Sequence, residues 1–288
     1  EARLERELET HTRILTHTRE AYAARIRSVA PMRELAEAEP VLAPLRAVKS
    51  AAEIAAIEHT ADVSVEAHRA AWRRMAPGVF EYQVAASMAY TMLDRGCQGH
   101  AYDPIVGSGI NGTVLHYSKN SRRIDQGDLV LIDAAAVCDA YADDITRTVP
   151  VSGKFTPRQR ELYEVVLGAY KAAVAAVKPG ATMAQLTETA RAYMNAHGKD
   201  AKGEGLGKYL KHRVSHGVGL EVHDYPSASY TEPLREGMVI TIEPGLYLPE
   251  ESIGIRIEDT LLVTATGARV LGAALPVEAA EIEKAMAR

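Results

Sequence analysis

Residues 129–148 read LVLIDAAAVCDAYADDITRT and contain two strand signals, each beside a carboxylate. Residues 129–132 are a short apolar run typical of a buried β-strand, and Asp133 ends it. Residues 146–149 predict a second strand, and a proline marks its end. Asp144 stands just before this second strand, eleven residues after Asp133. Two acidic side chains are therefore expected at the ends of two neighbouring strands.

Helix signals lie on both sides of this region. Ser50 and Glu53 form a capping box that predicts a helix running to about Met75. Thr156 before Pro157 predicts the start of another helix. Further short strands are predicted at 220–223, 239–243, 253–258 and 261–264. The order of helices, strands, helices and strands favours an α+β fold in which helices cover a mainly antiparallel sheet.

The composition excludes several classes of protein. The chain has 288 residues, which is enough for two domains or one large one. Hydrophobic residues make up 47% and charged residues 25%, as in ordinary globular proteins. The net charge of −5 provides no basic footprint for nucleic acid and no polybasic membrane patch. No apolar run approaches the ~18 residues of a membrane span. We therefore expect neither a nucleic acid nor a membrane as a partner.

The two cysteines, Cys97 and Cys138, are too few for a secreted disulfide framework. We expect them to be free thiols that pack as small buried hydrophobes. Their number fits a reducing compartment, so a cytoplasmic location is expected.

Five potential metal ligands lie at or near the ends of predicted strands. They are Asp133, Asp144, His216, Glu243 and Glu258. Four carboxylates that share one interior repel each other and are costly to bury. Two divalent cations would neutralise the four negative charges, so the set predicts a dimetal site. Oxygen ligands with one imidazole suit Mn²⁺, Co²⁺ or Zn²⁺ better than soft copper.

Four motifs make the chain similar to the pita-bread metallopeptidases. They are LVLIDAAAVCDAYADDITRT, SHGVGLEVHD, TIEPGLYL and GIRIED, and the similarity runs from about Pro44 to the C-terminus. The resemblance implies the pita-bread fold, a curved and mainly antiparallel sheet covered by helices in pseudo-two-fold halves. It also implies that Asp133 chelates one ion and that Asp144 and Glu258 bridge two ions. His216 and Glu243 would then bind the second ion.

The resemblance further implies hydrolysis of a peptide bond by a hydroxide that bridges two metal ions, with Mn²⁺ favoured. Glu243 would shuttle a proton from the attacking water to the leaving amine. His116, His223 and His212 match substrate-binding positions of the family, where imidazoles hold the substrate carbonyl. Arg256 alternates to the same strand face as Glu258. It would either pair with Asp133 or anchor a substrate terminus.

The remaining histidines have simpler interpretations. Five lie in or beside predicted helices and are expected to be solvated surface residues. They are His11, His17, His59, His68 and His197. His100 lies in a loop near the predicted site, and its role stays open.

Within the family, the sequence favours a metallo-aminopeptidase of the Xaa-Pro type. Arg256 argues against the methionine aminopeptidases, and the stretch around GIRIED and the C-terminal tail resemble aminopeptidase P. The expected substrate is a peptide with proline in the second position, and a homodimer or higher homo-oligomer is expected. Prolidase, which accepts only Xaa-Pro dipeptides, is the close alternative. A non-catalytic binding module of the same fold is a further alternative, but such relatives lose metal ligands.

The N-terminal region departs from the family pattern. Relatives of the aminopeptidase P and prolidase type carry a domain of roughly 100 or more residues before the catalytic one, within the usual size range of domains. Here residues 1–45 are expected to be a helical lead-in, the remnant of that domain, and 46–288 the catalytic domain. Because the chain has no initiator Met, we expect it to start inside a longer gene product.

Overall fold

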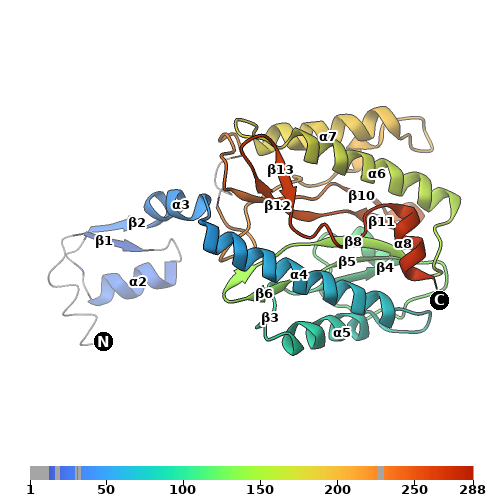
Figure 1. Cartoon of the computed structure of the whole chain (residues 1–288), viewed down its shortest axis with the longest axis horizontal. Helices are drawn as coiled ribbons and strands as arrows, with labels where there is room; N and C mark the ends of the chain where they lie inside the picture. Colours follow the sequence, from blue (N-terminus) through green and yellow to red (C-terminus); the bar gives the residue numbers. More distant parts are fainter. Residues whose placement is uncertain (1–12, 17–19, 30, 32–33, 226–229, 288) are drawn as a thin grey trace. The chain divides into compact units, whose positions relative to one another are not determined.

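The computed structural model describes residues 13–16, 20–29, 31, 34–225 and 230–287, and it divides into two units (Figure 1). The first unit is Glu1–Ala47 and the second is Val48–Arg288.

The first unit combines helices with two short strands. It contains β1 (Arg13–Thr16), α2 (Glu20–Val29), β2 (Glu34–Glu37) and α3 (Glu39–Ala47). β1 and β2 pair in parallel, with Ile14 opposite Leu35. The expected helical lead-in thus contains two helices together with a pair of strands that the sequence analysis did not predict. The run from Arg13 to Thr16 is rich in β-branched residues, and pairing with a second strand outweighs its weak helical periodicity.

Capping boxes at Ser50, Thr156 and Thr182 precede three of the helices described in the second unit. The helices of this unit are α4 (Ala51–Arg74), α5 (Glu81–Asp94), α6 (Pro157–Ala176), α7 (Met183–His197) and α8 (Ala279–Met286). Ser50 caps α4 and Thr156 caps α6, each in a reciprocal pair with the residue three positions later, as predicted. None of the helices in the described part of the chain is long and apolar enough to cross a membrane.

The strands form small antiparallel sheets. β4 (Ile105–Ser108), β5 (Leu129–Asp133) and β8 (Thr146–Pro150) form one, and β9 (Val239–Ile242), β12 (Asp259–Val263) and β13 (Ala268–Val270) form another. β3 (Gly99–His100), β6 (Ala136–Cys138) and β7 (Tyr141–Ala142) form a third, and β10 (Gly245–Leu248) pairs with β11 (Ile253–Arg256). In Figure 1 the strands β4, β5, β8, β10 and β11 lie between the pair α4 and α5 and the pair α6 and α7.

A pair of backbone hydrogen bonds joins two groups of strands. The N-terminal group is β3 to β8, and the C-terminal group is β9 to β13. Asp133 lies opposite Thr146 in the register of β5 and β8. Thr146 in turn exchanges backbone hydrogen bonds of 3.1 and 3.3 Å with Glu258, which lies between β11 and β12. This bridge brings residues 112 positions apart in the sequence side by side. The residues 220–223, predicted as a strand, form bends instead, because the Asp224 carboxylate accepts the Leu220 N–H at 2.9 Å.

A buried ion pair reinforces the same junction. The guanidinium of Arg147, on β8, lies 2.8 Å from the carboxylate of Asp259, on β12, and both side chains are fully buried. The Tyr170 hydroxyl of α6 also donates to Asp259, at 2.6 Å. Because removal of one partner would leave an uncompensated buried charge, these contacts hold the two groups of strands and α6 together.

His68, on α4, is buried, so the prediction that it is a solvated surface residue is wrong. Its Nε2 lies 3.0 Å from the carbonyl oxygen of Ala134, and burial together with the nearby Arg147 lowers the pKa of His68 to about 4. The position of His68 in the helical repeat did not predict its burial, because α4 is covered on several sides. His59 and His197 are exposed, as predicted. His11 and His17 lie outside the described residues.

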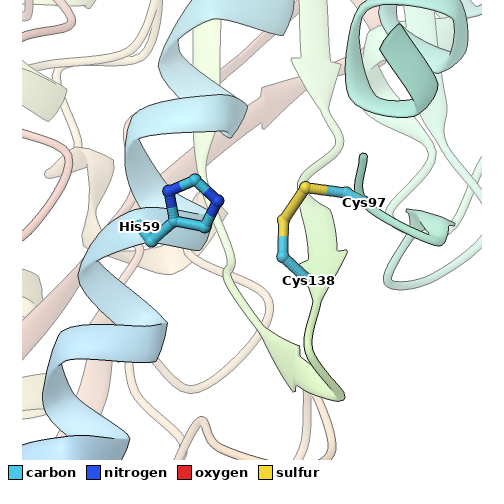
Figure 2. Close-up of side chains that lie close together, drawn as sticks. All are labelled: His59, Cys97 and Cys138. Carbon is cyan, nitrogen blue, oxygen red and sulfur yellow. A yellow bond between two sulfur atoms is a disulfide. The ribbon is translucent and has the colours of Figure 1, made fainter. Parts of the chain in front are cut away.

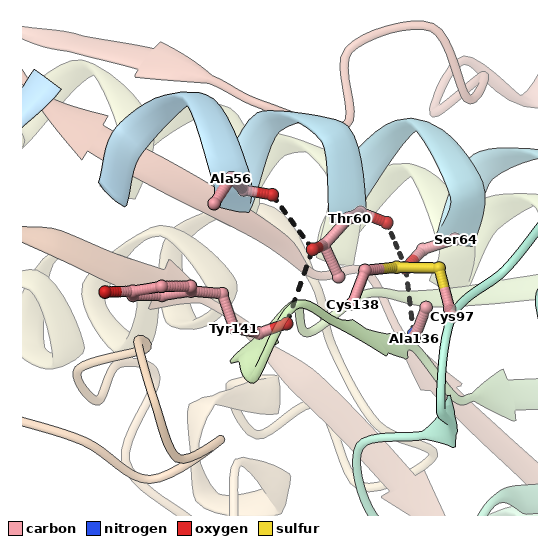
Figure 3. Close-up of a disulfide and its surroundings, with 7 residues drawn as sticks. All are labelled: Ala56, Thr60, Ser64, Cys97, Ala136, Cys138 and Tyr141. Atoms are coloured by element: carbon pink, nitrogen blue, oxygen red, sulfur yellow. Dashed lines mark hydrogen bonds between the residues drawn. A yellow bond between two sulfur atoms is a disulfide. The ribbon is translucent and has the colours of Figure 1, made fainter. Parts of the chain in front are cut away.

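Cys97 and Cys138 form a disulfide, so the prediction of free thiols is wrong (Figures 2 and 3). Cys97 follows α5, and Cys138 ends β6, with their Cα atoms 4.4 Å apart. The sequence could not reveal this pair, because 41 positions separate the two residues and only the pairing of β3 with β6 brings them together.

The burial of His68 predicts a pH dependence of folding. The pKa of His68 is lower in the folded state than the ordinary value of 6.5, so the fold favours the neutral ring. The associated stability is fully present above pH ~6.5 and is lost as the pH falls towards 4. Between these limits we expect the free energy of unfolding of the native protein to fall by about 3 kcal/mol more than that of His68→Gln.

Urea denaturation at several pH values measures this difference. His197→Gln, which changes an exposed histidine, should keep the pH dependence of the native protein. Equal pH slopes for His68→Gln and the native protein would show that the buried ring does not contribute.

Candidate functional site

A cavity of about 510 Å³ lies at the junction of the two groups of strands. It contains every residue that the sequence singled out for the site. The predicted residues that line it are Asp133, Asp144, His216, Glu243, Glu258, His116, His223, His212 and Arg256. Because these residues span 143 positions, only the fold brings them together, and the cavity is the candidate active site.

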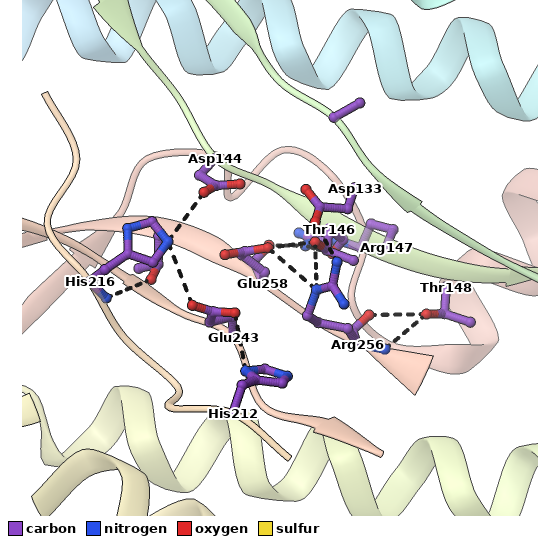
Figure 4. A network of polar contacts seen from close by, with 12 residues as sticks. Asp133, Asp144, Thr146, Arg147, Thr148, His212, His216, Glu243, Arg256 and Glu258 are labelled. Atoms are coloured by element: carbon purple, nitrogen blue, oxygen red, sulfur yellow. Dashed lines mark hydrogen bonds and ion pairs between the residues drawn. The ribbon is translucent and has the colours of Figure 1, made fainter. Parts of the chain in front are cut away.

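The carboxylates reach the cavity from the ends of buried strands. Asp133 is the last residue of β5, and Asp144 precedes β8. Glu243 follows β9, and Glu258 follows β11. The apolar residues of these strands are buried in the core, which fixes the backbone and directs the acidic side chains inward (Figure 4).

Three ligand atoms of this set lie close enough to share an ion. One atom each from Asp144, His216 and Glu258 lies within 4.8 Å of the others. Nε2 of His216 is 3.3 Å from Asp144 and 3.5 Å from Glu243. Nδ1 of His216 lies 3.0 Å from the carbonyl oxygen of Gly217, and this contact assigns the ring proton to Nδ1. Nε2 then presents a lone pair to the acidic group, as a metal ligand requires.

Burial makes the full ionisation of this acidic group costly. Burial raises the pKa of Asp144 well above its ordinary value, and the neighbouring Asp133 raises it further. Burial likewise raises the pKa of Glu258 and of Glu243, and in both cases a nearby carboxylate adds to the effect. Divalent cations would remove this cost by supplying positive charge among the oxygens. The donor set of carboxylates with one imidazole therefore fits hard or intermediate divalent ions.

Asp133 is held by an arginine and a tyrosine. Arg256 on β11 is buried and pairs with Asp133 through its guanidinium, and it also donates to the Tyr247 hydroxyl at 2.9 Å. The Tyr102 hydroxyl lies 2.6 Å from Asp133 and 2.7 Å from Asp144, so its single proton serves one carboxylate at a time. The sequence left open whether Arg256 pairs with Asp133 or anchors a substrate terminus, and the structure has the pairing with Asp133.

The histidines line different parts of the cavity. His116 and His223 are exposed to solvent at the cavity surface, and the His223 ring stands edge-on to His216 at 4.4 Å between centroids. His212 lies deeper, with Nε2 2.7 Å from the Tyr247 hydroxyl and Nδ1 3.4 Å from Glu243. Burial lowers the pKa of His212 to about 4, and it lowers the pKa of His223 as well.

His100, whose role the sequence left open, does not line this cavity. It lies on β3, and burial lowers the pKa of its imidazole. Nothing in its surroundings assigns it a part in the site.

The sequence did not point to Tyr102, Tyr247 or Glu81. Glu81, at the start of α5, is fully buried and accepts hydrogen bonds from the backbone N–H of Ser108 and the hydroxyl of Tyr117, at 2.8 and 2.7 Å. These contacts fix the segment that carries His116. A glutamate in the first turn of a helix is common, and neither a tyrosine in a loop, as Tyr102 is, nor one on a strand, as Tyr247 is, has a distinctive spacing, so no signal separated them from ordinary structural residues.

The position of Tyr102 predicts its effect on metal binding. Tyr102→Phe removes the hydroxyl that holds Asp133 beside Asp144 but keeps the ring. Since partners of ligands typically contribute 10–100-fold to metal affinity, we expect a loss of about that size. Titration of the chelator-treated protein with Mn²⁺ measures it. Tyr209→Phe removes a hydroxyl bonded to Asp200, outside the cavity, and should bind Mn²⁺ as the native protein does. Equal affinities of both variants would contradict this role of Tyr102.

Comparisons with known proteins agree with this geometry. The chain is 41% identical over 248 residues to an Xaa-Pro dipeptidase of Pyrococcus horikoshii, covering 85% of this chain and 68% of the relative. It is 37% identical over 268 residues to an Xaa-Pro aminopeptidase of Escherichia coli, covering 86% and 61%. The chain thus spans about two thirds of the length of these relatives.

The solved structures show the same fold. Proline aminopeptidase P II from Yersinia pestis superposes with a TM-score of 0.89 at 35% identity, covering 99% of this chain and 74% of that protein. The expected α+β fold of the pita-bread type is therefore confirmed. Residues 55–265 match metallopeptidase family M24, which is most of the chain. The chain belongs to this family of hydrolases.

Proposed function

We propose that this chain is a dimetal-dependent exopeptidase that hydrolyses the bond between the N-terminal residue of a peptide and a following proline. The observation that carries the proposal is the convergence of Asp133, Asp144, His216, Glu243 and Glu258 in one cavity of an M24 family member. The relatives named above act on Xaa-Pro bonds by their names. A non-catalytic binding module would not need this complete set of ligands.

The five residues are proposed to hold two divalent ions. Asp133 would bind one ion, His216 and Glu243 the other, and Asp144 and Glu258 both. Mn²⁺ is the proposed metal, with Co²⁺ or Zn²⁺ compatible with the same donors. Two such ions lower the pKa of a water and stabilise the negative charge that develops on the substrate carbonyl.

The chain itself supplies the proton transfers. Glu243 has one oxygen 3.5 Å from His216 and the other 3.4 Å from His212. A carboxylate in this position can accept a proton from the attacking water and deliver it to the leaving amine of proline. His212, whose pKa is about 4, is neutral at pH 7, and its Nδ1 donates to the Arg213 carbonyl oxygen at 2.8 Å, so the ring borders this oxygen of Glu243 without adding charge to the site.

His116 and His223 are proposed to bind the substrate. Both present their rings at the exposed surface of the cavity, near the acidic group. An imidazole there can donate a hydrogen bond to the substrate carbonyl and stabilise its developing charge.

The contacts of Arg256 favour an aminopeptidase over a dipeptidase. A dipeptide carries its free carboxylate directly after proline, and a dipeptidase must compensate that charge. The guanidinium of Arg256 already contacts Asp133 and Tyr247, so it is not available to bind a substrate carboxylate. The second candidate is a prolidase, and Arg213 is the observation that favours it. Its guanidinium lines the cavity and lies 3.8 Å from the centroid of the Tyr230 ring, where it can meet a carboxylate.

Peptide hydrolysis with added Mn²⁺ tests both candidates. We expect a larger kcat/KM for an Xaa-Pro-Yaa tripeptide than for the Xaa-Pro dipeptide, because the cavity must stay open for the next residue. An Xaa-Ala-Yaa tripeptide should be a poor substrate, and Glu258→Ala provides the control for contaminating peptidases. A dipeptide advantage of tenfold or more, about 1.4 kcal/mol of transition-state binding, would assign the prolidase activity. Failure to cut any Xaa-Pro peptide would contradict the proposal itself.

A further inference from the structure

A second group of metal-binding side chains lies outside the cavity. One ligand atom each from His59, Cys97 and Cys138 lies within 4.8 Å of the others. His59 comes from α4, and Figure 2 shows its ring facing the two sulfur atoms across a short gap. None of the three residues lines the candidate active site. The group therefore needs an explanation of its own.

The backbone holds the two sulfur atoms near each other independently of the bond between them. The Cys97 N–H donates to the Met92 carbonyl at 3.1 Å, at the end of α5. The Gln98 N–H donates to the Val137 carbonyl at 2.9 Å, which pairs this segment with β6. Both cysteines are buried. Opening the disulfide would thus leave two thiols close together.

The helix that carries His59 is fixed against β6 and the neighbouring strand β7. The Ser64 hydroxyl accepts a hydrogen bond from the Ala136 N–H at 3.0 Å, and the Thr60 hydroxyl lies 3.3 Å from the Tyr141 carbonyl oxygen (Figure 3). The neighbour of Thr60, His59, is exposed, and its ring has no hydrogen-bonding partner among the described residues. Its imidazole is therefore free to bind a ligand.

We propose that His59, Cys97 and Cys138 form a redox-gated site for a thiophilic divalent cation such as Zn²⁺. In the oxidised protein the two sulfur atoms form the disulfide and bind no ion. A dithiol reductant opens it: the reductant loses two electrons and two protons and becomes a disulfide, and the protein gains two thiols. The cation then binds two thiolates and the imidazole and releases the two thiol protons.

The donor set and the spacing suit this ion. Thiolate and imidazole ligands select zinc over hard cations, in contrast to the oxygen-rich cavity. Zn–S distances of about 2.3 Å and Zn–N distances of about 2.0–2.1 Å put ligand atoms roughly 3.5–4 Å apart. The sulfur atoms must separate from bonding distance, and the imidazole is already within reach. The exposure of His59 leaves the fourth position to solvent water.

The site also has a structural consequence for the catalytic region. Residues 97–138 include Tyr102, His116 and Asp133, so the disulfide closes a loop that carries several residues of the cavity. A cation on the same two cysteines would close the same loop in the reduced protein. The loop would then be closed in both the oxidised and the metal-bound states, and only the reduced metal-free state would lack this closure.

Co²⁺ titration tests the proposal. The chain has only two cysteines, so a sulfur-to-cobalt charge-transfer band reports this site and not the cavity. We expect the reduced native protein to show one equivalent of thiolate-bound Co²⁺ and the oxidised protein to show none. His59→Ala should weaken the binding at least tenfold, whereas His197→Ala, another exposed histidine, should leave it unchanged.

Three results would overturn the proposal. The first is the absence of the charge-transfer band in the reduced native protein. The second is equal Co²⁺ affinity of His59→Ala and the native protein. The third is alkylation of both cysteines in protein kept without reductant in air, which would show that no disulfide competes with the metal. Because none of these readouts uses peptidase activity, they are independent of the proposed function.

Discussion

The mutual repulsion of buried carboxylates is the constraint on which this structure depends. Asp133, Asp144, Glu243 and Glu258 converge on one cavity, and Arg256, which also lies 3.8 Å from Glu258, makes its close ion pair with Asp133. The pKa of each of the other three is raised by burial and by a neighbouring acid. This repulsion lowers the stability of the metal-free protein. Divalent cations bound among the carboxylates would remove it by supplying positive charge.

Hydrogen bonds and an ion pair between the two groups of strands hold the carboxylates together in spite of this repulsion. Thr146 bridges to Glu258 through the backbone, and the adjacent residues Arg147 and Asp259 form a buried ion pair. The acidic residues therefore lie beside a buried polar junction and cannot move apart to relieve their repulsion. The Cys97–Cys138 disulfide also closes the loop that carries Asp133. Rigid backbone and unfavourable charge together give a preorganised site.

Much of the fold could be predicted from local sequence, because its signals are local. The apolar run before Asp133 and the reciprocal caps at Ser50 and Thr156 each depend on a few neighbouring residues, and the structure contains each of them. The resemblance to a family then ordered the acidic residues. Features that depend on distant partners were missed. Tyr102 is defined by two carboxylates that are 31 and 42 positions away, and His68 by the burial of α4.

Anomalous diffraction from Mn²⁺-soaked crystals tests the central claim most directly. The account predicts two anomalous peaks in the cavity, both within coordination distance of Asp144 and Glu258, with one also on Asp133 and the other on His216. It also predicts that both peaks disappear in crystals of Asp144→Ala soaked in the same way. A cavity without anomalous density in fully soaked crystals of the native protein would contradict the account, because the acidic group would then have to be protonated and not metal-bound.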